Sequence, residues 1–561
     1  MLENRKLLME KPKPIWGEAY FWLTVLAGGF FLSLTLWFSF GMDQSIYSYG
    51  AWVWKHYHLP PYVGAWDQNF PGIFILHRLA LALFGESILG FRIFDFLVQL
   101  SCLVMIFHLS RRLSGSARAG FLSGLFYGIY YYGLGNYDTG QRDGYVFWLL
   151  LIALVLSLTL KHRTWLRAAL VGLVLGFAFL VKPFYGLAWP VFGVWFLLLE
   201  IKDRPQRALI GLALFSLACL VPSGLIVLYY EKLGYLRELY RATLWYGFMI
   251  YSGAGHDQAA HLWWFRFALT ISSISWEAPL LFSAIFIVLR QWKNKNELRD
   301  RQLFGVLTSL MAAALICYRL QGKFFPYQLL PFMGLMMIFS GIGWNWIGSK
   351  LMEGIEAARR RLLAVAFPLV LILLLIISTN HELILFSIKY DFRNLDRAHL
   401  AGMNDSSDLH NSSNNYLVAK KLSSLAGAGD EIEYFGPYPL IAFVLKKKLP
   451  SRFCCVQHLL FLPSSGRLGV LQKEWIEEYT AAVIQARPRF FLVSDVFPGQ
   501  TYIFFNFAAN GLKQALREQF PALQKFLDDN YELMAREGVI EIYELRKAAP
   551  ASPSPGGREP E

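Results

Sequence analysis

Residues 19–40 read AYFWLTVLAGGFFLSLTLWFSF, a run of apolar and aromatic side chains without a charge. A helix needs roughly 20 mostly apolar residues to cross the hydrocarbon core of a bilayer, and this run is long enough. A basic segment precedes it (Arg5, Lys6, Lys11, Lys13), and no small-x-small cleavage site follows it. The sequence therefore predicts that residues 19–40 form an uncleaved first transmembrane helix.

Similar apolar runs recur through the first two thirds of the chain. Hydrophobic residues make up 55% of the 561 residues and charged residues only 17%, whereas soluble domains carry about a quarter charged residues. Counting runs of the required length predicts about eleven transmembrane helices. We expect them near residues 19–40, 90–110, 115–135, 144–160, 166–181, 184–200, 207–229, 265–290, 302–319, 326–347 and 362–379.

The basic residues lie mostly in alternate loops between these runs. If the N-terminus is cytoplasmic, the inside loops are the ones rich in Lys and Arg, as the positive-inside rule requires: Arg111-Arg112, Lys161 to Arg163, Lys202 to Arg207, Arg290 to Arg301 and Lys350 to Arg361. An odd number of spans then places the C-terminal part on the outer side. Because the net charge of +13 is dispersed in this way, it does not indicate nucleic-acid binding.

The first outer loop is long and aromatic. Residues 41–71 mix polar residues with Tyr47, Tyr49, Trp52, Trp54 and Tyr57, side chains that are typical of the headgroup region of a membrane. Residues 72–85 are apolar but too short to span. We expect interfacial helices over residues 41–85, flanked by Arg78 and Arg92 as membrane anchors.

The character of the chain changes after residue 384. Polar segments alternate with short apolar runs, EIEYF (431–435) and RFFLVSD (489–495) indicate strands, and helices are expected near 412–425, 472–486 and 512–535. The predicted architecture is a polytopic α-helical membrane domain over residues 1–384, followed by an extracytoplasmic α/β domain over residues 385–548. Residues 549–561, rich in Pro, Gly and Ser, predict a disordered tail.

Charged residues beside the outer ends of the spans are candidates for chemistry, because ionisable groups at membrane depth are costly. They are Asp43, Asp67, Asp138, Arg142, Asp143, Lys182, Arg319 and Lys323. A carboxylate here could act as a general base and a cation could bind phosphate. Asp43 follows the first span directly, and its other interpretation is a residue at a helix start.

The remaining charged positions each have a structural alternative as well. Arg142, in GNYDTGQRDGYVF (135–147), binds a phosphate or forms a local ion pair at the start of the fourth span. Lys182, Arg319 and Lys323 bind phosphate or reach the membrane surface as anchors. The chain has no phosphate-binding Gly-rich loop, zinc spacing or Gly-x-Ser-x-Gly motif. No cofactor is predicted, and a divalent metal stays open without a motif to support it.

At this point the sequence resembles the GT-C superfamily of polytopic glycosyltransferases, which includes the protein O-mannosyltransferases and the bacterial transferases that add aminoarabinose to lipid A. The resemblance rests on the stretch from GMDQSIYSYG (41–50) to Arg92, on GQRDGYVFWLLL, on GLVLGFAFLVKP (172–183) and on QGKFFPYQLLP. The Asp-Glu pair of the family appears here as Asp43-Gln44, so only the first acid is shared. Phe70-Pro71 stands where the lipid A subgroup has two prolines.

The resemblance implies an inverting glycosyltransferase that moves a monosaccharide from a polyprenyl-phosphate donor to a lipid, glycan or protein acceptor. It implies Asp43 as the catalytic base and Asp143 as a second acid, with donor phosphate contacts from Arg142, Lys182, Arg319 and Lys323. Substrate contacts are expected from Asp67, Asp138 and Tyr327. The expected location is the inner (plasma) membrane with a periplasmic C-terminal domain. A lipid-linked glycan flippase, or a GT-C-like glycan ligase or polymerase, remains an alternative function.

Overall fold

The arrangement of the chain comes from a computed structural model. It describes residues 15–160, 162–252, 278–293, 298–353, 412–463, 465–495 and 507–547. The predicted span at 362–379, the first part of the one at 265–290 and the predicted tail at 549–561 lie outside the described residues.

Eight helical segments of the described residues are long and apolar enough to cross a membrane. They are Ala19–Trp37 (α2, Ala19–Leu34, with a 3-10 turn), α5 (Ile88–Ser114), α8 (Arg142–Thr159), α9 (Thr164–Val181), Pro183–Glu200 (ending in α10, Ala188–Glu200), α11 (Pro205–Lys232), α15 (Arg301–Gln321) and Pro326–Leu351 (ending in α16, Leu330–Leu351). Each coincides with a predicted span. The prediction at 115–135 corresponds to the shorter helix α6 (Ala117–Gly133), and α14 (Ala278–Lys293) covers the later part of 265–290. The chain is therefore a multi-pass helical membrane protein, as predicted.

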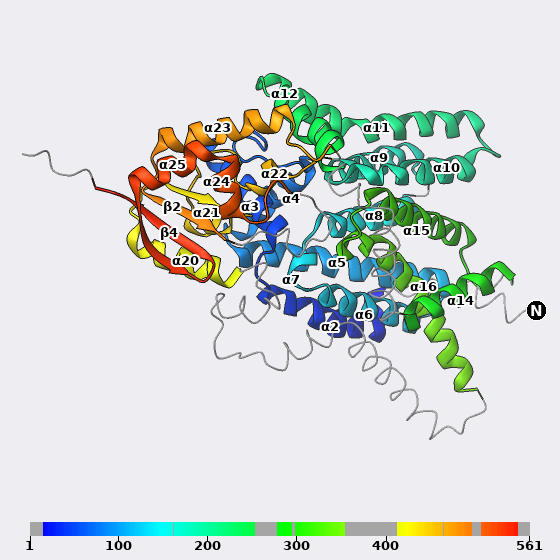
Figure 1. Ribbon diagram of the computed structural model, residues 1–561. Helices are drawn as coiled ribbons and strands as arrows, with labels where there is room; N and C mark the ends of the chain where they lie inside the picture. The colour runs from blue at the N-terminus through cyan, green and yellow to red at the C-terminus, as the bar shows by residue number, and fades with distance from the viewer. Residues whose placement is uncertain are drawn as a thin grey trace, which may run out of the picture.

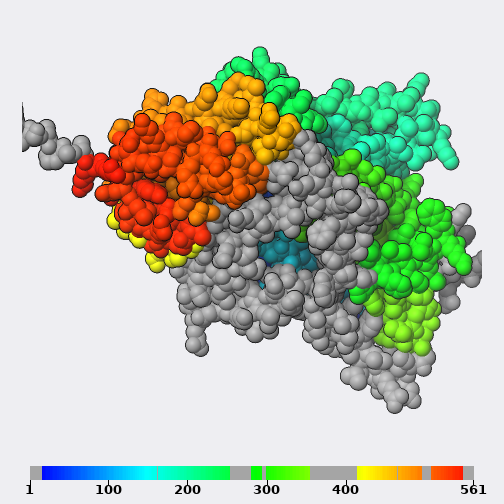
Figure 2. All heavy atoms as spheres, viewed as in Figure 1, coloured from blue at the N-terminus to red at the C-terminus, as the bar shows by residue number. Residues whose placement is uncertain are grey.

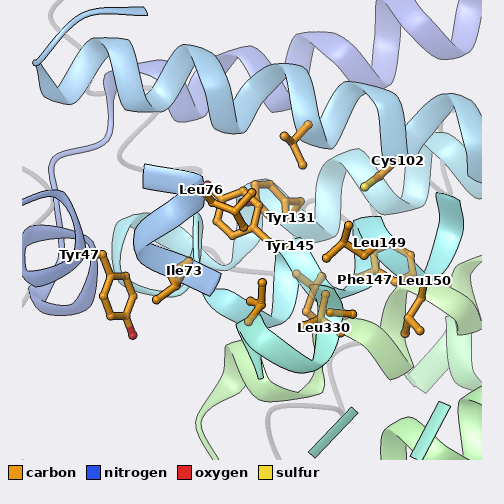
Figure 3. Packing of buried hydrophobic residues seen from close by; sticks show 14 of the residues in the cluster. Tyr47, Ile73, Leu76, Cys102, Tyr131, Tyr145, Phe147, Leu149, Leu150 and Leu330 are labelled. Atoms are coloured by element: carbon orange, nitrogen blue, oxygen red, sulfur yellow. The ribbon is translucent and has the colours of Figure 1, made fainter. Parts of the chain in front are cut away.

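Small residues let several of these helices pack closely. A Cβ on Gly128 of α6 would lie 2.7 Å from the carbonyl oxygen of Gly28 in α2, and one on Gly176 of α9 would lie 2.3 Å from that of Cys219 in α11. Such backbone-to-backbone contacts between small residues are a main source of helix association in membranes. Figure 1 shows α2, α5, α6 and α16 running side by side, and Figure 3 shows the packed interior around Leu149 and Leu330.

Residues 41–85 contain two helices whose side chains are largely buried in the protein. These are α3 (Met42–Tyr57) and α4 (Gly72–Phe84). Tyr47 and Tyr49 are fully buried, Trp52 and Trp54 are at most 9% exposed, and only Tyr57 is exposed. These four side chains therefore pack inside the protein, and Tyr49 accepts a hydrogen bond from the Leu449 amide of the C-terminal region at 2.8 Å. The placement of residues 41–85 at the membrane interface stays a prediction.

The C-terminal region contains a four-stranded sheet of order β1-β2-β4-β3. Its strands are β1 (Ile432–Phe435), β2 (Phe490–Ser494), β3 (Tyr531–Glu537) and β4 (Ile540–Leu545), with β1 and β2 parallel and the other pairs antiparallel. Helices α20 (Ser412–Leu425), α21 (Leu440–Leu445), α22 (Gln457–Leu460), α23 (Val470–Ala486), α24 (Leu512–Gln519) and α25 (Pro521–Asn530) surround it.

Both predicted strands and the helices near 412–425 and 472–486 are confirmed in this region. The single helix expected over 512–535 was wrong. Pro521 starts a new helix after Phe520, since proline lacks the amide hydrogen that would continue the first one. The chain then enters β3, which forms a hairpin with β4 around Gly538 at a φ of 56°. This hairpin was not predicted from the sequence.

The C-terminal region packs on the end of the helical bundle that carries α3. Figure 1 shows it gathered at that end, and in Figure 2 its orange atoms lie directly against the green segment around α12 (Leu236–Tyr240). Arg452 contributes strongly to the junction: it bonds the Tyr62 carbonyl at 3.0 Å and forms an ion pair with Glu238 at 2.6 Å. The Trp66 amide in turn donates to the Arg452 carbonyl at 2.7 Å.

Candidate functional site

A pocket lies where the ends of several helices meet the C-terminal region. We call it the mouth pocket. From the bundle and its loops it is lined by Met42, Asp43, Gln68, Asn69, Tyr137, Gln141, Arg142, Tyr251, Phe325 and Tyr327; from the C-terminal region it is lined by Gln457, His458, Phe461 and Phe507. Asp43, Arg142 and Tyr327, predicted from distant parts of the sequence, thus share one cavity.

The loop before α8 is fixed by side chains from other elements. It includes the short helix α7 (Gly135–Asp138). The amide nitrogen of Gln44 donates to the carbonyls of Asn136, Tyr137 and Thr139 at 3.2, 3.1 and 2.6 Å. Arg92 is fully buried and donates to the Thr139 hydroxyl at 3.0 Å and the Asn136 carbonyl at 3.1 Å. The expectation that Arg92 is a membrane anchor was therefore wrong, because its guanidinium positions this loop.

Asp43 lies in the first turn of α3, where the partial positive charge of a helix N-terminus favours a carboxylate. Its side chain is half-buried and lines the mouth pocket. Burial raises the pKa of Asp43 to about 6, against the opposing effect of the positive charge on Arg142. Asp43 is thus ionised at neutral pH, yet its affinity for a proton is higher than that of an ordinary aspartate, which suits a general base.

Arg142 is the first residue of α8, and the Gln44 and Arg92 contacts hold the loop that leads into it. Its Nε is buried and has no hydrogen-bond partner among the described residues, and the same is true of Oε1 of the neighbouring Gln141. Buried polar groups without partners are rare because each costs about 1–3 kcal/mol. Both residues line the mouth pocket, so a polar ligand there could supply the missing partners.

Asp138 lies at the end of α7 and does not line the pocket. Burial raises its pKa to about 7, and the negative charge of Asp43 adds to the shift. The two carboxylates therefore interact, and ionisation of one disfavours ionisation of the other. The role of Asp138 as a substrate contact stays a prediction.

Asp143 and Lys182 form a buried ion pair behind the pocket lining. The Nζ atom of Lys182 lies 2.5 Å from Oδ2 of Asp143, and the Tyr185 hydroxyl donates to Oδ1 of Asp143 at 3.2 Å. Asp143 is fully buried and Lys182 is 3% exposed. The ion-pair partner of Asp143 is thus Lys182, which directly follows α9. The predicted roles of both members of the pair at the substrate stay predictions.

The end of α15 and the loop that follows it contribute three of the predicted residues. Tyr327 lines the pocket, and its ring lies 5.6 Å from Lys182 Nζ. Lys323 donates to the Tyr251 carbonyl at 3.0 Å and so holds a pocket residue rather than lining the pocket itself. Arg319 does not line the pocket either; its guanidinium lies 5.6 Å from the ring centre of Phe324.

Asp67 acts on the pocket through its neighbour. It is 1% exposed and accepts a hydrogen bond from the Asn69 amide at 2.8 Å, while the same amide donates to the Tyr47 hydroxyl at 3.0 Å. Asn69 lines the mouth pocket, so Asp67 fixes the orientation of a lining residue. Burial raises the pKa of Asp67, with the Asn69 hydrogen bond opposing it.

Several lining residues were missed from the sequence. Gln141 directly precedes Arg142, and its place in GQRDGYVF was a usable signal. Tyr251, His458, Phe461 and Phe507 have no motif around them, and only the folded chain brings them to the pocket. Within the described ranges, no group of three or more His, Cys, Asp or Glu side chains has the arrangement of a metal site.

Comparison with known proteins supports the predicted resemblance. Residues 68–229 match the family described as dolichyl-phosphate-mannose-protein mannosyltransferase. The matched part contains α4 to α11 and therefore Arg92, Arg142, Asp143 and Lys182. It does not include Asp43 or the C-terminal region.

Two curated relatives are bacterial. The undecaprenyl phosphate-alpha-4-amino-4-deoxy-L-arabinose arabinosyl transferase 1 of Pseudomonas fluorescens (strain Pf0-1) is 26% identical over 277 residues, which cover 46% of this chain and 44% of the relative. The corresponding transferase of Pseudomonas aeruginosa (strain LESB58) is 28% identical over 279 residues, covering 44% and 48%. The chain thus aligns with less than half the length of these relatives.

A solved structure matches almost the entire chain. The crystal structure of ArnT from Cupriavidus metallidurans in the apo state aligns with a TM-score of 0.51 and 12% sequence identity, covering 91% of this chain and 96% of that one. At this identity the likeness shows a shared fold. The predicted fold class, a GT-C-like helical membrane protein with a C-terminal α/β region, is confirmed by this match.

Proposed function

We propose that this protein is a glycosyltransferase that moves a monosaccharide from a polyprenyl-phosphate donor to an acceptor hydroxyl in the mouth pocket. The observation that carries the proposal is the meeting of Asp43 and Arg142 in one pocket at the end of a membrane bundle. A carboxylate with a raised pKa can take a proton, and an arginine can bind a phosphate through paired hydrogen bonds.

The reaction balances without an acid. The acceptor oxygen attacks the anomeric carbon as its proton passes to Asp43, and the bond from that carbon to the phosphate oxygen breaks. The polyprenyl phosphate leaves as an anion, which needs no proton if a fixed positive charge stabilises it. Arg142 supplies that charge, because its Nε has no hydrogen-bond partner among the described residues.

Lys182 acts indirectly in this proposal, through the pocket residue Tyr327 and not through a contact with the phosphate. Its charge is balanced by Asp143 at 2.5 Å, and the buried pair lies beside Tyr327 at the pocket wall. Lys323 likewise acts by holding Tyr251. The pocket thus combines one direct cation, Arg142, with two lysines that shape its wall.

The names of the relatives suggest which donors to test first. Undecaprenyl phosphate-linked 4-amino-4-deoxy-L-arabinose follows from the arabinosyl transferases, and a polyprenyl-phosphate mannose follows from the family description. The acceptor is proposed to be a hydroxyl group of a lipid, glycan or protein.

We further propose that the mouth pocket opens on the outer side of the inner membrane. Two ion pairs join helix ends beside the loops that were predicted to be cytoplasmic: Arg112 lies 3.1 Å from Asp300, and Arg167 near the start of α9 lies 2.8 Å from Glu200 at the end of α10. Arg142 lies at the other end of α8 from the turn that leads into α9, and Asp43 follows the span Ala19–Trp37. The positive-inside rule then places the basic end in the cytoplasm.

Labelling of single cysteines tests the orientation. The five native cysteines are buried, so a new thiol at Val470, which is 77% exposed in the C-terminal region, would dominate labelling. A membrane-impermeant maleimide should label Val470→Cys in cells with a permeable outer barrier and spare Lys202→Cys, which lies in an exposed turn after α10. The reverse pattern would contradict the orientation.

The proposed activity is tested with purified protein in nanodiscs. Each of the two donors, labelled in the sugar, is incubated with membrane lipid extract, and the label is followed into a product that resists mild acid cleavage of the sugar phosphate. We expect transfer with one donor and its loss in Asp43→Asn. Absence of a new glycosidic product with any polyprenyl-phosphate sugar, while labelled lipid crosses the bilayer, would instead support a flippase.

A further inference from the structure

His458 from the C-terminal region lines the same pocket as Asp43 and Arg142. It belongs to the short helix α22, which also presents Gln457; the Gln457 amide nitrogen lies 2.8 Å from the sulfur of Met42, the residue before Asp43. The C-terminal region therefore forms a wall of the proposed active site. This wall could not be predicted from the sequence, because nothing around His458 resembles a motif.

The His458 ring is held firmly but its hydrogen bonds are incomplete. The side chain is only 4% exposed, and it packs edge-on to Trp66 at 5.6 Å and parallel to Phe461 at 5.8 Å. Its Nε2 lies 4.0 Å from the Cys455 sulfur. Its Nδ1 is buried and has no hydrogen-bond partner among the described residues. A fixed, unpaired polar atom of this kind is unfavourable until a ligand supplies its partner.

Burial also decides the charge of the ring. It lowers the pKa of His458 to about 3, so the imidazole is neutral at physiological pH. A neutral imidazole has one donor and one acceptor nitrogen, and it forms hydrogen bonds with neutral groups such as hydroxyls. It does not add to the positive charge that Arg142 presents to a phosphate.

The surroundings of His458 favour a sugar ring as the ligand. Phe461 stacks on Phe507 at 4.8 Å and meets Tyr251 edge-on at 5.8 Å, and all three line the pocket. A sugar combines apolar C–H faces, which pack on aromatic rings, with hydroxyl groups at its edge. Ligand pockets with aromatic walls and few fixed polar groups recognise such molecules by the placement of those polar groups.

We propose that Nδ1 of His458 hydrogen-bonds a hydroxyl group of a sugar bound in the mouth pocket, and that this contact helps to select the sugar. The inference rests on the proposed glycosyltransferase function and deepens it. The sugar is either the one transferred from the donor or one that belongs to a glycan acceptor. In both cases the chemistry is a neutral hydroxyl group against a neutral imidazole.

Three substitutions separate hydrogen bonding from packing. His458→Phe keeps a ring between Trp66 and Phe461 but removes both nitrogens. His458→Asn places an amide near the position of Nδ1, whereas His458→Gln places one near Nε2. His56→Phe, at an exposed histidine outside the pocket, is the matched control. Thermal unfolding of each purified variant in nanodiscs reports whether it folds.

Donor and acceptor KM values then identify the source of the sugar. Loss of one hydrogen bond should raise KM roughly 3- to 10-fold for the substrate that carries the sugar, with recovery in His458→Asn and not in His458→Gln. A rise confined to the donor assigns the transferred sugar, and a rise confined to the acceptor assigns the acceptor glycan. Unchanged KM values in a folded His458→Phe protein, or equal losses in all three variants, would overturn the proposal.

Two further readouts do not depend on those variants. The deoxy analogue that lacks the hydroxyl group bound by His458 should bind wild-type protein about as weakly as the natural sugar binds His458→Phe. The same analogue should bind His458→Phe no more weakly than it binds wild-type protein. Donor-dependent thermal stabilisation measures binding even without turnover. If the donor stabilises wild-type protein but no sugar is transferred, the proposed function is contradicted and the role of His458 is not. If sugar is transferred and each deoxy analogue weakens binding equally in wild type and His458→Phe, the role of His458 is contradicted and the proposed function is not.

Discussion

The side-chain amide of Gln44 donates to the carbonyl oxygen of Thr139 at 2.6 Å, and this contact ties the start of α3 to the loop before α8. The same nitrogen also reaches the carbonyls of Asn136 and Tyr137. Asp43 precedes Gln44 and Arg142 follows the loop, so the contact sets the distance between the proposed base and the proposed phosphate ligand. An amide can do this because it donates, and an ionised carboxylate cannot.

Gln44→Glu should therefore lower both the activity and the stability of the protein, although it recreates the Asp-Glu pair of the family that the sequence resembles. A carboxylate facing three carbonyl oxygens repels them, and the loop that carries Arg142 should move away from Asp43. We expect kcat to fall about tenfold or more, by the loss of several hydrogen bonds between the neutral amide and backbone carbonyls, with a lower Tm. Gln44→Met, which removes the donor without adding charge, should be milder. Equal or higher activity in Gln44→Glu would show that the position accepts an acid.

Asp43 should impose a pH dependence on transfer. Burial raises its pKa to about 6, and a general base must be deprotonated to act. The rate should thus be constant at neutral pH and fall as the pH decreases through about 6, approaching a tenfold loss per pH unit. Asp43→Asn should reduce kcat by roughly 10²- to 10⁴-fold without a large change in donor binding. A rate that rises as the pH falls below 6 would contradict the assignment.

Arg142 and Arg319 provide a comparison of two arginines that the sequence placed in the same role. Arg142 lines the mouth pocket and Arg319 does not. Arg142→Gln should raise the donor KM roughly 10- to 100-fold, as expected for loss of a hydrogen bond to a charged group. Arg319→Gln should have a clearly smaller effect, since Arg319 does not line the pocket. A larger effect at Arg319 would move the phosphate site toward the end of α15.

The ion pair between Lys182 and Asp143 should contribute to the thermal stability of the protein. Both side chains are buried and lie 2.5 Å apart. Lys182→Met alone leaves a buried carboxylate without its cation, and breaking a buried pair in this way costs about 3–5 kcal/mol. The double variant Lys182→Met/Asp143→Asn should recover much of the lost Tm. A Lys182→Met protein as stable as wild type would show that the pair is not maintained in the membrane.

Much of the bundle could be predicted from the sequence because its signal is local. Runs such as residues 19–40 and 205–232 are apolar along their length, and a helix is the form in which a single segment satisfies its backbone inside lipid. The position of α3 could not be predicted, because Tyr49 and Trp52 are equally suited to headgroups and to a protein interior. Their burial depends on the C-terminal region, whose contacts come from about 400 residues further along the chain, as at Leu449.

For the site, the sequence indicated which charges lie at the outer helix ends but not which ones pair. Asp143 is adjacent to Arg142 in sequence, yet its partner is Lys182, because the first turn of α8 directs the two neighbours to different sides. His458 was missed for another reason. A single histidine in an apolar stretch is most often a packing residue, and only its unpaired Nδ1 and its place in the pocket distinguish it.

The most direct test of the central claim is a cryo-EM structure of the wild-type protein in nanodiscs with undecaprenyl phosphate. We expect phosphate density in the mouth pocket within hydrogen-bond distance, about 3 Å, of the Arg142 guanidinium, with the Asp43 carboxylate facing the same cavity. Phosphate density bound elsewhere, with Arg142 paired to a protein carboxylate and the pocket closed to the lipid, would contradict it.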